Sequence, residues 1–144
     1  MPTIFSRIIA GEIPGTFVWS DDICVAFMSI NPINHGHTLV VPRFEVDQWT
    51  DLSRDVATHL MAVSHTIGSA QKRAFDCNRI GMMIVGFEVP HVHIHLIPAS
   101  SMEHFSFRNA AITPDFADIG RAADAIRSSL GSAEAVPTAL GSSS

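Results

Sequence analysis

The stretch Pro90-His91-Val92-His93-Ile94-His95-Leu96-Ile97-Pro98 carries the strongest pattern in this chain. Its histidines alternate with aliphatic residues, and residues i and i+2 of a β-strand share one face about 6.6 Å apart. The alternation predicts a strand over 91–97, with three imidazoles on one side and an aliphatic face against a core. The flanking prolines are typical of strand ends. Since each buried imidazole has two nitrogens that need partners, three in a row indicate a site rather than ordinary packing.

The remaining residues predict an α+β domain. An apolar helical stripe over residues 4–9 and a longer one over 52–74 indicate a short N-terminal helix and one long helix, for which Ser53 or Asp51 is the expected N-cap. Apolar runs between turn residues indicate further strands. Short connections favour an antiparallel meander crossed by the long helix. The predicted strands are 16–19, 23–28, 37–42, 79–85 and 91–97.

The C-terminal third carries weaker signals. Residues 99–113 show no clear period, whereas 114–130 form a predicted helix. Its apolar face carries Phe116, Ile119, Ala123 and Ile126. The small, polar end of the chain is expected to fray. We therefore expect a single domain over 1–130, divided into a core at 3–98 and a helical extension at 99–130, and a flexible tail at 131–144.

Composition narrows the class of protein. The 144 residues are 47% hydrophobic and 16% charged, which fits a compact fold and excludes a disordered one. A net charge of −5 gives no basic patch for nucleic acid, so no nucleic-acid partner is expected. No signal peptide or membrane-spanning run is evident. Cys24 and Cys77 have no metal or redox spacing, and we interpret them as reduced packing residues of a cytoplasmic protein.

Three chemical interpretations of the histidine strand remain open. The imidazoles could be a structural cluster, or they could bind a metal ion, although Glu88 is the only nearby anionic candidate. The third interpretation is nucleophilic catalysis, since a neutral imidazole attacks phosphorus near pH 7 and a neighbouring histidine supplies a donor to the phosphate. The loop at Gly86 suits this chemistry because a glycine lets backbone N–H groups approach phosphate oxygens.

Several stretches of the sequence resemble the motifs of a known family. The alternating run is similar to the His-φ-His-φ-His-φ-φ signature of the histidine triad (HIT) family of nucleotide hydrolases and transferases, where φ is an apolar residue. Further blocks agree in order, and the resemblance covers roughly residues 3–98. These blocks are Ile4-Phe5-Ser6-Arg7-Ile8-Ile9-Ala10-Gly11-Glu12-Ile13-Pro14, Ala26-Phe27-Met28-Ser29-Ile30-Asn31-Pro32 and Gly36-His37-Thr38-Leu39-Val40-Val41-Pro42.

The resemblance implies a fold and a set of roles. It implies a five-stranded antiparallel sheet with a long helix, paired into a homodimer. His93 would be the nucleophile that forms a covalent nucleotidyl-imidazole, and His95 would contact the phosphate and the leaving group. His91 and His37 would sit behind His93 in a hydrogen-bonded relay that sets its tautomer. The expected lining of the base pocket is Ile4, Phe5, Ile8, Phe27 and Ile30.

Some positions depart from the family pattern. Many relatives carry an acidic residue at the position of Ser29, where it holds the ribose hydroxyls; a serine makes only weaker neutral bonds. Glu88 stands where others have Ser or Thr, and its charge would repel a phosphate unless it pairs with a histidine or turns outward. The positions that match a zinc site of bacterial relatives hold Thr3, Ser6, Glu45 and His91, so no zinc is expected there.

These observations converge on one expected function. The chain is interpreted as a histidine triad hydrolase that acts at the α-phosphorus of a nucleoside monophosphate conjugate, such as a phosphoramidate or a dinucleoside polyphosphate. Ser29, Gly86 and Glu88 join the apolar pocket as expected substrate-binding residues. No metal ion or other cofactor is required. The alternative function is that of a nucleotide-binding or scaffolding protein with little turnover. A second and weaker alternative is that of a metal-binding protein.

Overall fold

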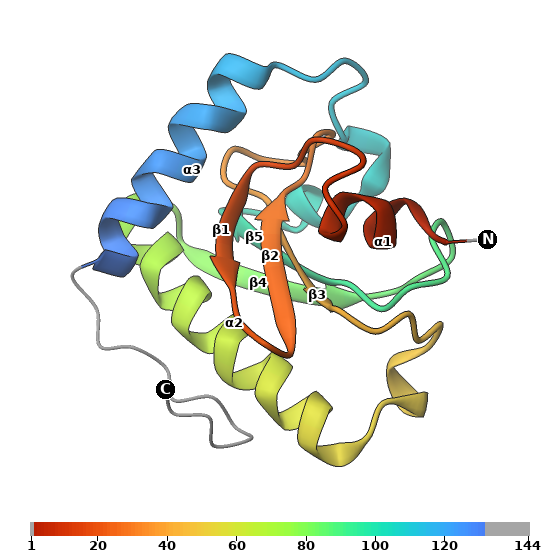
Figure 1. The fold of residues 1–144 in the computed structure, drawn as a ribbon. Helices are drawn as coiled ribbons and strands as arrows, with labels where there is room; N and C mark the ends of the chain where they lie inside the picture. Colours follow the sequence, from red (N-terminus) through yellow and green to blue (C-terminus); the bar gives the residue numbers. More distant parts are fainter. Residues whose placement is uncertain (1, 132–144) are drawn as a thin grey trace.

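The computed structural model describes residues 2–131, and the tail predicted at 131–144 lies, apart from Gly131, outside them. An antiparallel five-stranded sheet forms the centre of the molecule (Figure 1), with strand order β1-β2-β3-β5-β4. The predicted five-stranded antiparallel sheet is therefore confirmed. The strands are β1 (Phe17–Ser20), β2 (Cys24–Met28), β3 (Thr38–Pro42), β4 (Arg79–Ile84) and β5 (Ile94–Ala99).

Three α-helices surround the sheet: α1 (Ile4–Ile9), α2 (Arg54–Ala74) and α3 (Phe116–Gly131). The α1 helix ends where Gly11 adopts a φ of +83°, a left-handed conformation that glycine accepts without a steric cost. The α2 helix begins at the predicted cap, since the Ser53 side chain accepts a hydrogen bond from the N–H of Val56. Short 3-10 turns occupy Trp49–Asp51, Met102–Phe105 and Phe107–Asn109.

The sheet is covered on both faces, which explains why every residue of β2 and β3 is buried. Alternate β2 residues, such as Ala26 and Met28, pack with α2 and α3 in one core. Val25 and Phe27 point the other way and pack with Phe5 of α1 in a second core. A buried glutamine of α2, Gln71, donates hydrogen bonds from Nε2 to the backbone oxygens of Gly36 and Leu96 at 2.9 and 3.1 Å, which fixes the long helix to the sheet.

The histidine strand is shorter and later than predicted. β5 begins at Ile94, so His91, which lies at a bend, and His93 both precede it and only His95 belongs to the strand. Pro98 does not end the strand but pairs with Ile80. It is tolerated because the β3 ladder reaches only as far as Leu96, so β5 has a strand neighbour on one side at this point.

Two further expectations are wrong. The sheet is not a simple meander, because β5 inserts between β3 and β4 after the crossover through α2. The apolar face predicted for the C-terminal helix includes Phe116, but this residue is the first of α3 and its side chain is 66% exposed. Ala122 is buried in its place, together with Ile119, Ala123 and Ile126. Among the described residues, no helix has the length and apolar character needed to cross a bilayer.

Candidate active site

A cavity of about 320 Å³ opens beside the histidines, between α1, β2 and the C-terminal 3-10 turns. This volume lies at the lower end of the range for small-molecule sites. Most predicted site residues line it: Ile4, Phe5, Ile8, Phe27, Ser29, Ile30, His37, Glu88, His93 and His95. His91 and Gly86 are not among the lining residues, so the expectation that Gly86 contacts the substrate finds no support in the geometry.

His93 is held in one orientation and one tautomer. Its Nδ1 lies 2.8 Å from the backbone oxygen of His91, and because a carbonyl can only accept, Nδ1 must carry the proton. The lone pair therefore resides on Nε2, the nitrogen that remains for the cavity. Burial lowers the pKa of His93 below its ordinary value, which keeps the ring neutral at pH 7. The edge-on ring of Phe5, 4.8 Å away between centroids, restricts rotation of the imidazole.

The ring of His95 is held in the opposite tautomer to that of His93. The N–H of Ile33 donates to Nδ1 of His37 at 3.1 Å, so this nitrogen is an acceptor and His37 carries its proton on Nε2. That proton is donated to Nδ1 of His95 at 3.0 Å. His95 must then carry its own proton on Nε2. Burial lowers the pKa of His37 to about 3 and that of His95 to about 4, which keeps both rings neutral.

The predicted relay behind His93 is therefore wrong for His37, whereas His91 does fix the tautomer of His93. His37 bonds to His95, not to His93. His91 supports His93 through its backbone oxygen, while its ring turns away from the cavity. Its Nε2 donates to the backbone oxygen of Pro42 at 2.8 Å and its Nδ1 accepts from the hydroxyl of Thr3 at 2.7 Å. The structure thus presents a lone pair on His93 beside an N–H donor on His95, with ring centroids 4.9 Å apart.

The residues at the four positions of the bacterial zinc site form a hydrogen-bonded cluster made of Thr3, Ser6, Glu45 and His91. Oε1 of Glu45 accepts from the backbone N–H of Thr3 and from the hydroxyl of Ser6, both at 2.7 Å. The hydroxyl of Thr3 also caps α1 by accepting from the N–H of Ser6. Because both ring nitrogens of His91 already have partners, and two of the other groups are hydroxyls, this donor set does not fit zinc. It attaches the start of α1 to the segment that precedes His93.

Some cavity residues were missed by sequence reasoning. Phe107 and Ala110 of the C-terminal extension line the cavity, and the Phe107 ring lies edge-on to His95 at 5.1 Å between centroids. No periodic signal marks residues 99–113, so only the tertiary structure reveals this wall. Glu88 is exposed at the rim of the cavity. Burial lowers the pKa of His93, and the negative charge of Glu88 raises it, which offsets part of that lowering.

Known proteins are similar to this chain in sequence and in fold. The HIT domain matches residues 10–102. The chain is 39% identical over 99 residues to an uncharacterized HIT-like protein of Methanocaldococcus jannaschii, covering 66% of this chain and 77% of that one. It is 35% identical over 108 residues to the purine nucleoside phosphoramidase of Escherichia coli, covering 66% of this chain and 85% of that enzyme.

A solved structure extends the likeness beyond the matched domain. A Hit-like protein from Bartonella henselae superimposes with a TM-score of 0.77 at 30% identity, covering 88% of this chain and 95% of that one. The domain match spans well over half of the chain and includes all four histidines of the site. By the sequence match, the shared fold and the arrangement of these histidines, the chain belongs to the HIT domain family.

Proposed function

We propose that this protein is a nucleotide hydrolase or transferase that acts at the α-phosphorus of a nucleoside monophosphate conjugate, of the phosphoramidate or dinucleoside polyphosphate kind. The observation that carries the proposal is the opposite tautomer assignment of two adjacent rings. His93 offers a lone pair and His95 offers an N–H to the same cavity. Attack on phosphorus needs both a nucleophile and a donor beside it. The phosphoramidase activity of the E. coli relative is consistent with this chemistry.

The proposed course has two steps. Nε2 of His93 bonds to the α-phosphorus and the bond to the leaving group breaks, giving a nucleotidyl-imidazolium. The leaving atom accepts a hydrogen bond from Nε2 of His95 and departs with a proton taken from solvent. Water then attacks the same phosphorus, the phosphorus–nitrogen bond breaks, and one proton returns to solvent. The product is the nucleoside monophosphate and His93 is restored.

The nucleoside part of the substrate would occupy the apolar side of the cavity. Phe5, Ile8 and Phe27 provide a hydrophobic surface for a base, and Ser29, which also lines the cavity, would bind the ribose hydroxyls. A second function, nucleotide binding with little turnover, is favoured by one observation. The described residues that line the cavity include the carboxylate of Glu88 at its rim but no Lys or Arg, so none of them adds a formal positive charge to stabilise a phosphoryl transition state.

We also propose that the protein is a homodimer built on α2 and β4. β4 is an edge strand of the described sheet, and Met61 of α2 and Met82 of β4 are exposed beside it. Ser64 lines the same groove as these two methionines and is buried with no hydrogen-bond partner for its hydroxyl among the described residues. A second copy would cover the apolar side chains and the open strand edge. Sedimentation analysis of the native chain and of Met61→Glu tests this, since the variant should be monomeric.

The test of the activity uses a fluorogenic adenosine phosphoramidate. The native chain should release the fluorescent amine, and His93→Ala should not, although it should still bind adenosine monophosphate because the base pocket is intact. Ile112→Ala, a change at an exposed residue outside the cavity, is the control and should keep the native rate. Equal rates in the native chain and His93→Ala would refute the nucleophile. Nucleotide binding without turnover in the native chain would favour the second function.

A further inference from the structure

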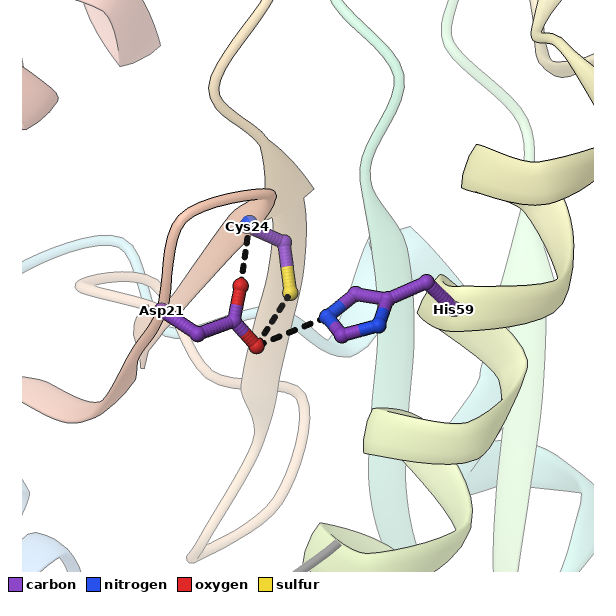
Figure 2. A group of neighbouring side chains, drawn as sticks. All are labelled: Asp21, Cys24 and His59. Atoms are coloured by element: carbon purple, nitrogen blue, oxygen red, sulfur yellow. Dashed lines mark hydrogen bonds and ion pairs between the residues drawn. The ribbon is translucent and has the colours of Figure 1, made fainter. Parts of the chain in front are cut away.

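A second cluster of chemically reactive groups lies apart from the cavity. Asp21 in the β1–β2 turn, Cys24 at the start of β2 and His59 of α2 point toward one another, as Figure 2 shows. Oδ2 of Asp21 lies 2.7 Å from Nε2 of His59 and 3.8 Å from Sγ of Cys24. The three atoms all lie within 4.8 Å of one another. None of these residues lines the cavity, so the proposed activity does not account for the cluster.

The carboxylate of Asp21 is held firmly by groups around it. Oδ1 accepts from the backbone N–H groups of Ile23 and Cys24 at 2.7 and 2.8 Å. Oδ2 accepts from the indole N–H of Trp19 at 2.8 Å. Cys24 and His59 are fully buried, whereas the Asp21 side chain remains 11% exposed and gives solvent a route to the cluster. The carboxylate of Asp21 is therefore held in place by hydrogen bonds from outside the cluster, as is typical of ligands in metal sites.

We propose that Asp21, Cys24 and His59 form a binding site for a thiophilic divalent cation of the zinc class. Zinc lies about 2.0–2.3 Å from O, N and S ligands, so neighbouring ligand atoms of a tetrahedral site are roughly 3.3–3.7 Å apart. The separation of Oδ2 and Sγ, 3.8 Å, is longer than this range by only about 0.1 Å. Nε2 of His59, now 2.7 Å from Oδ2, moves away by roughly half an ångström when the metal replaces the proton between them.

The charges and protons of the site balance. A carboxylate and a thiolate together neutralise a divalent cation, and a neutral assembly is the kind that a buried position tolerates. The proton of the Cys24 thiol goes to solvent, and His59 binds through Nε2 as the neutral ring with its proton on Nδ1. The fourth coordination position remains for water. A thiolate and an imidazole beside one carboxylate favour a thiophilic cation such as zinc, whereas magnesium and calcium prefer sites made of oxygen ligands.

The test is titration of the native chain and of Cys77→Ser with cobalt(II), a spectroscopic substitute for zinc. The chain has two cysteines, so Cys77→Ser leaves Cys24 as its single thiol. A thiolate–cobalt charge-transfer band that saturates at one equivalent in both proteins, disappears on unfolding and is displaced by zinc is the expected result. The active-site histidines cannot produce this band. His59→Gln, which removes a direct ligand, should weaken binding by at least about tenfold.

Three outcomes would overturn the proposal. The first is a folded Cys77→Ser protein that shows no charge-transfer band at saturating cobalt. The second is a band that persists with unchanged affinity in His59→Gln. The third is an increase in the thermal midpoint with zinc that is the same in the native chain and in Cys24→Ser. If Cys24→Ser does not fold, the spectra of Cys77→Ser decide alone, because they need no change at the proposed site.

Discussion

The dependence of the free energy of unfolding on pH tests, without any mutation, whether the buried histidines are neutral in the folded protein. In the folded protein, burial holds the pKa of His37 at about 3 and that of His95 at about 4, against 6.5 for an exposed imidazole. Below pH 6.5 the unfolded chain therefore binds protons that the folded chain does not. The sign follows directly: stability is complete above pH 6.5 and is lost as the pH falls toward the folded pKa values.

The size of the loss comes from linkage. At about pH 5.5 each of the two rings is roughly 90% protonated in the unfolded chain and largely neutral in the folded one, which costs about 1.4 kcal/mol per ring. Together His37 and His95 remove about 3 kcal/mol between about pH 8 and about pH 5.5. The pKa values of His91 and His93 are also lowered by burial, so they act in the same direction. Carboxylates titrate below this window and do not contribute.

The assay is urea unfolding followed by circular dichroism at the two pH values, with the free energy of unfolding extrapolated to water. His37→Gln separates the contribution of one ring, because its amide does not titrate and offers both an acceptor for Ile33 and a donor for His95. We expect this variant to lose roughly half of the pH dependence. Ile112→Ala, a change at a residue that is exposed and lies outside the cavity, is the control and should keep the native dependence.

A free energy of unfolding that stays constant between the two pH values would refute the neutral assignment of the histidines. It would mean that the rings bind protons equally in both states, and that His95 is not restricted to one tautomer. An unchanged pH dependence in His37→Gln would refute the specific connection from His37 to His95, whatever the total.

Three further expectations concern the cavity. Ser29→Asp replaces neutral with charge-assisted bonds to ribose hydroxyls, so KM for a nucleoside phosphoramidate should fall about tenfold at constant kcat; an unchanged KM would place the ribose elsewhere. Burial lowers the pKa of His93, and the charge of Glu88 raises it, so Glu88→Gln should shift the acidic limb of the kcat/KM profile to lower pH; a shift to higher pH would contradict this. Phe107→Ala removes a ring from the wall beside His95, so the ratio of kcat/KM for bulky over small leaving groups should rise; a constant ratio would exclude this wall from leaving-group selection.

Much of the fold follows from local patterns. The helical periodicities locate α1 and α2 within one or two residues, and the turn residues separate the strands. The position of β5 between β3 and β4 did not follow, because the pairing Ile84↔Ile94 joins consecutive strands but the pairing Val40↔Ile94 joins strands that are far apart in the sequence. Local alternation predicts a strand but says nothing about its neighbours.

The active site, like the fold, could be predicted from the sequence only in part. The alternation predicted three rings on one side; those of His93 and His95 do line one cavity, but the ring of His91 is turned away toward Thr3 and Pro42. The connections between the rings could not be predicted, because they depend on a loop N–H at Ile33 and on a backbone oxygen at His91. The wall formed by Phe107 depends on how the C-terminal extension folds back, and that extension has no periodic signal.

The proposed covalent step can be observed directly. The native chain is mixed in excess with an adenosine phosphoramidate and quenched in alkali, which preserves phosphorus–nitrogen bonds to imidazole, and its peptides are analysed by mass spectrometry. The predicted result is one adenylyl group on His93 that forms before, or as fast as, the amine is released. Amine release with no adduct on His93, or with the adduct on His95 or His91, would contradict the assignment of His93 as the nucleophile.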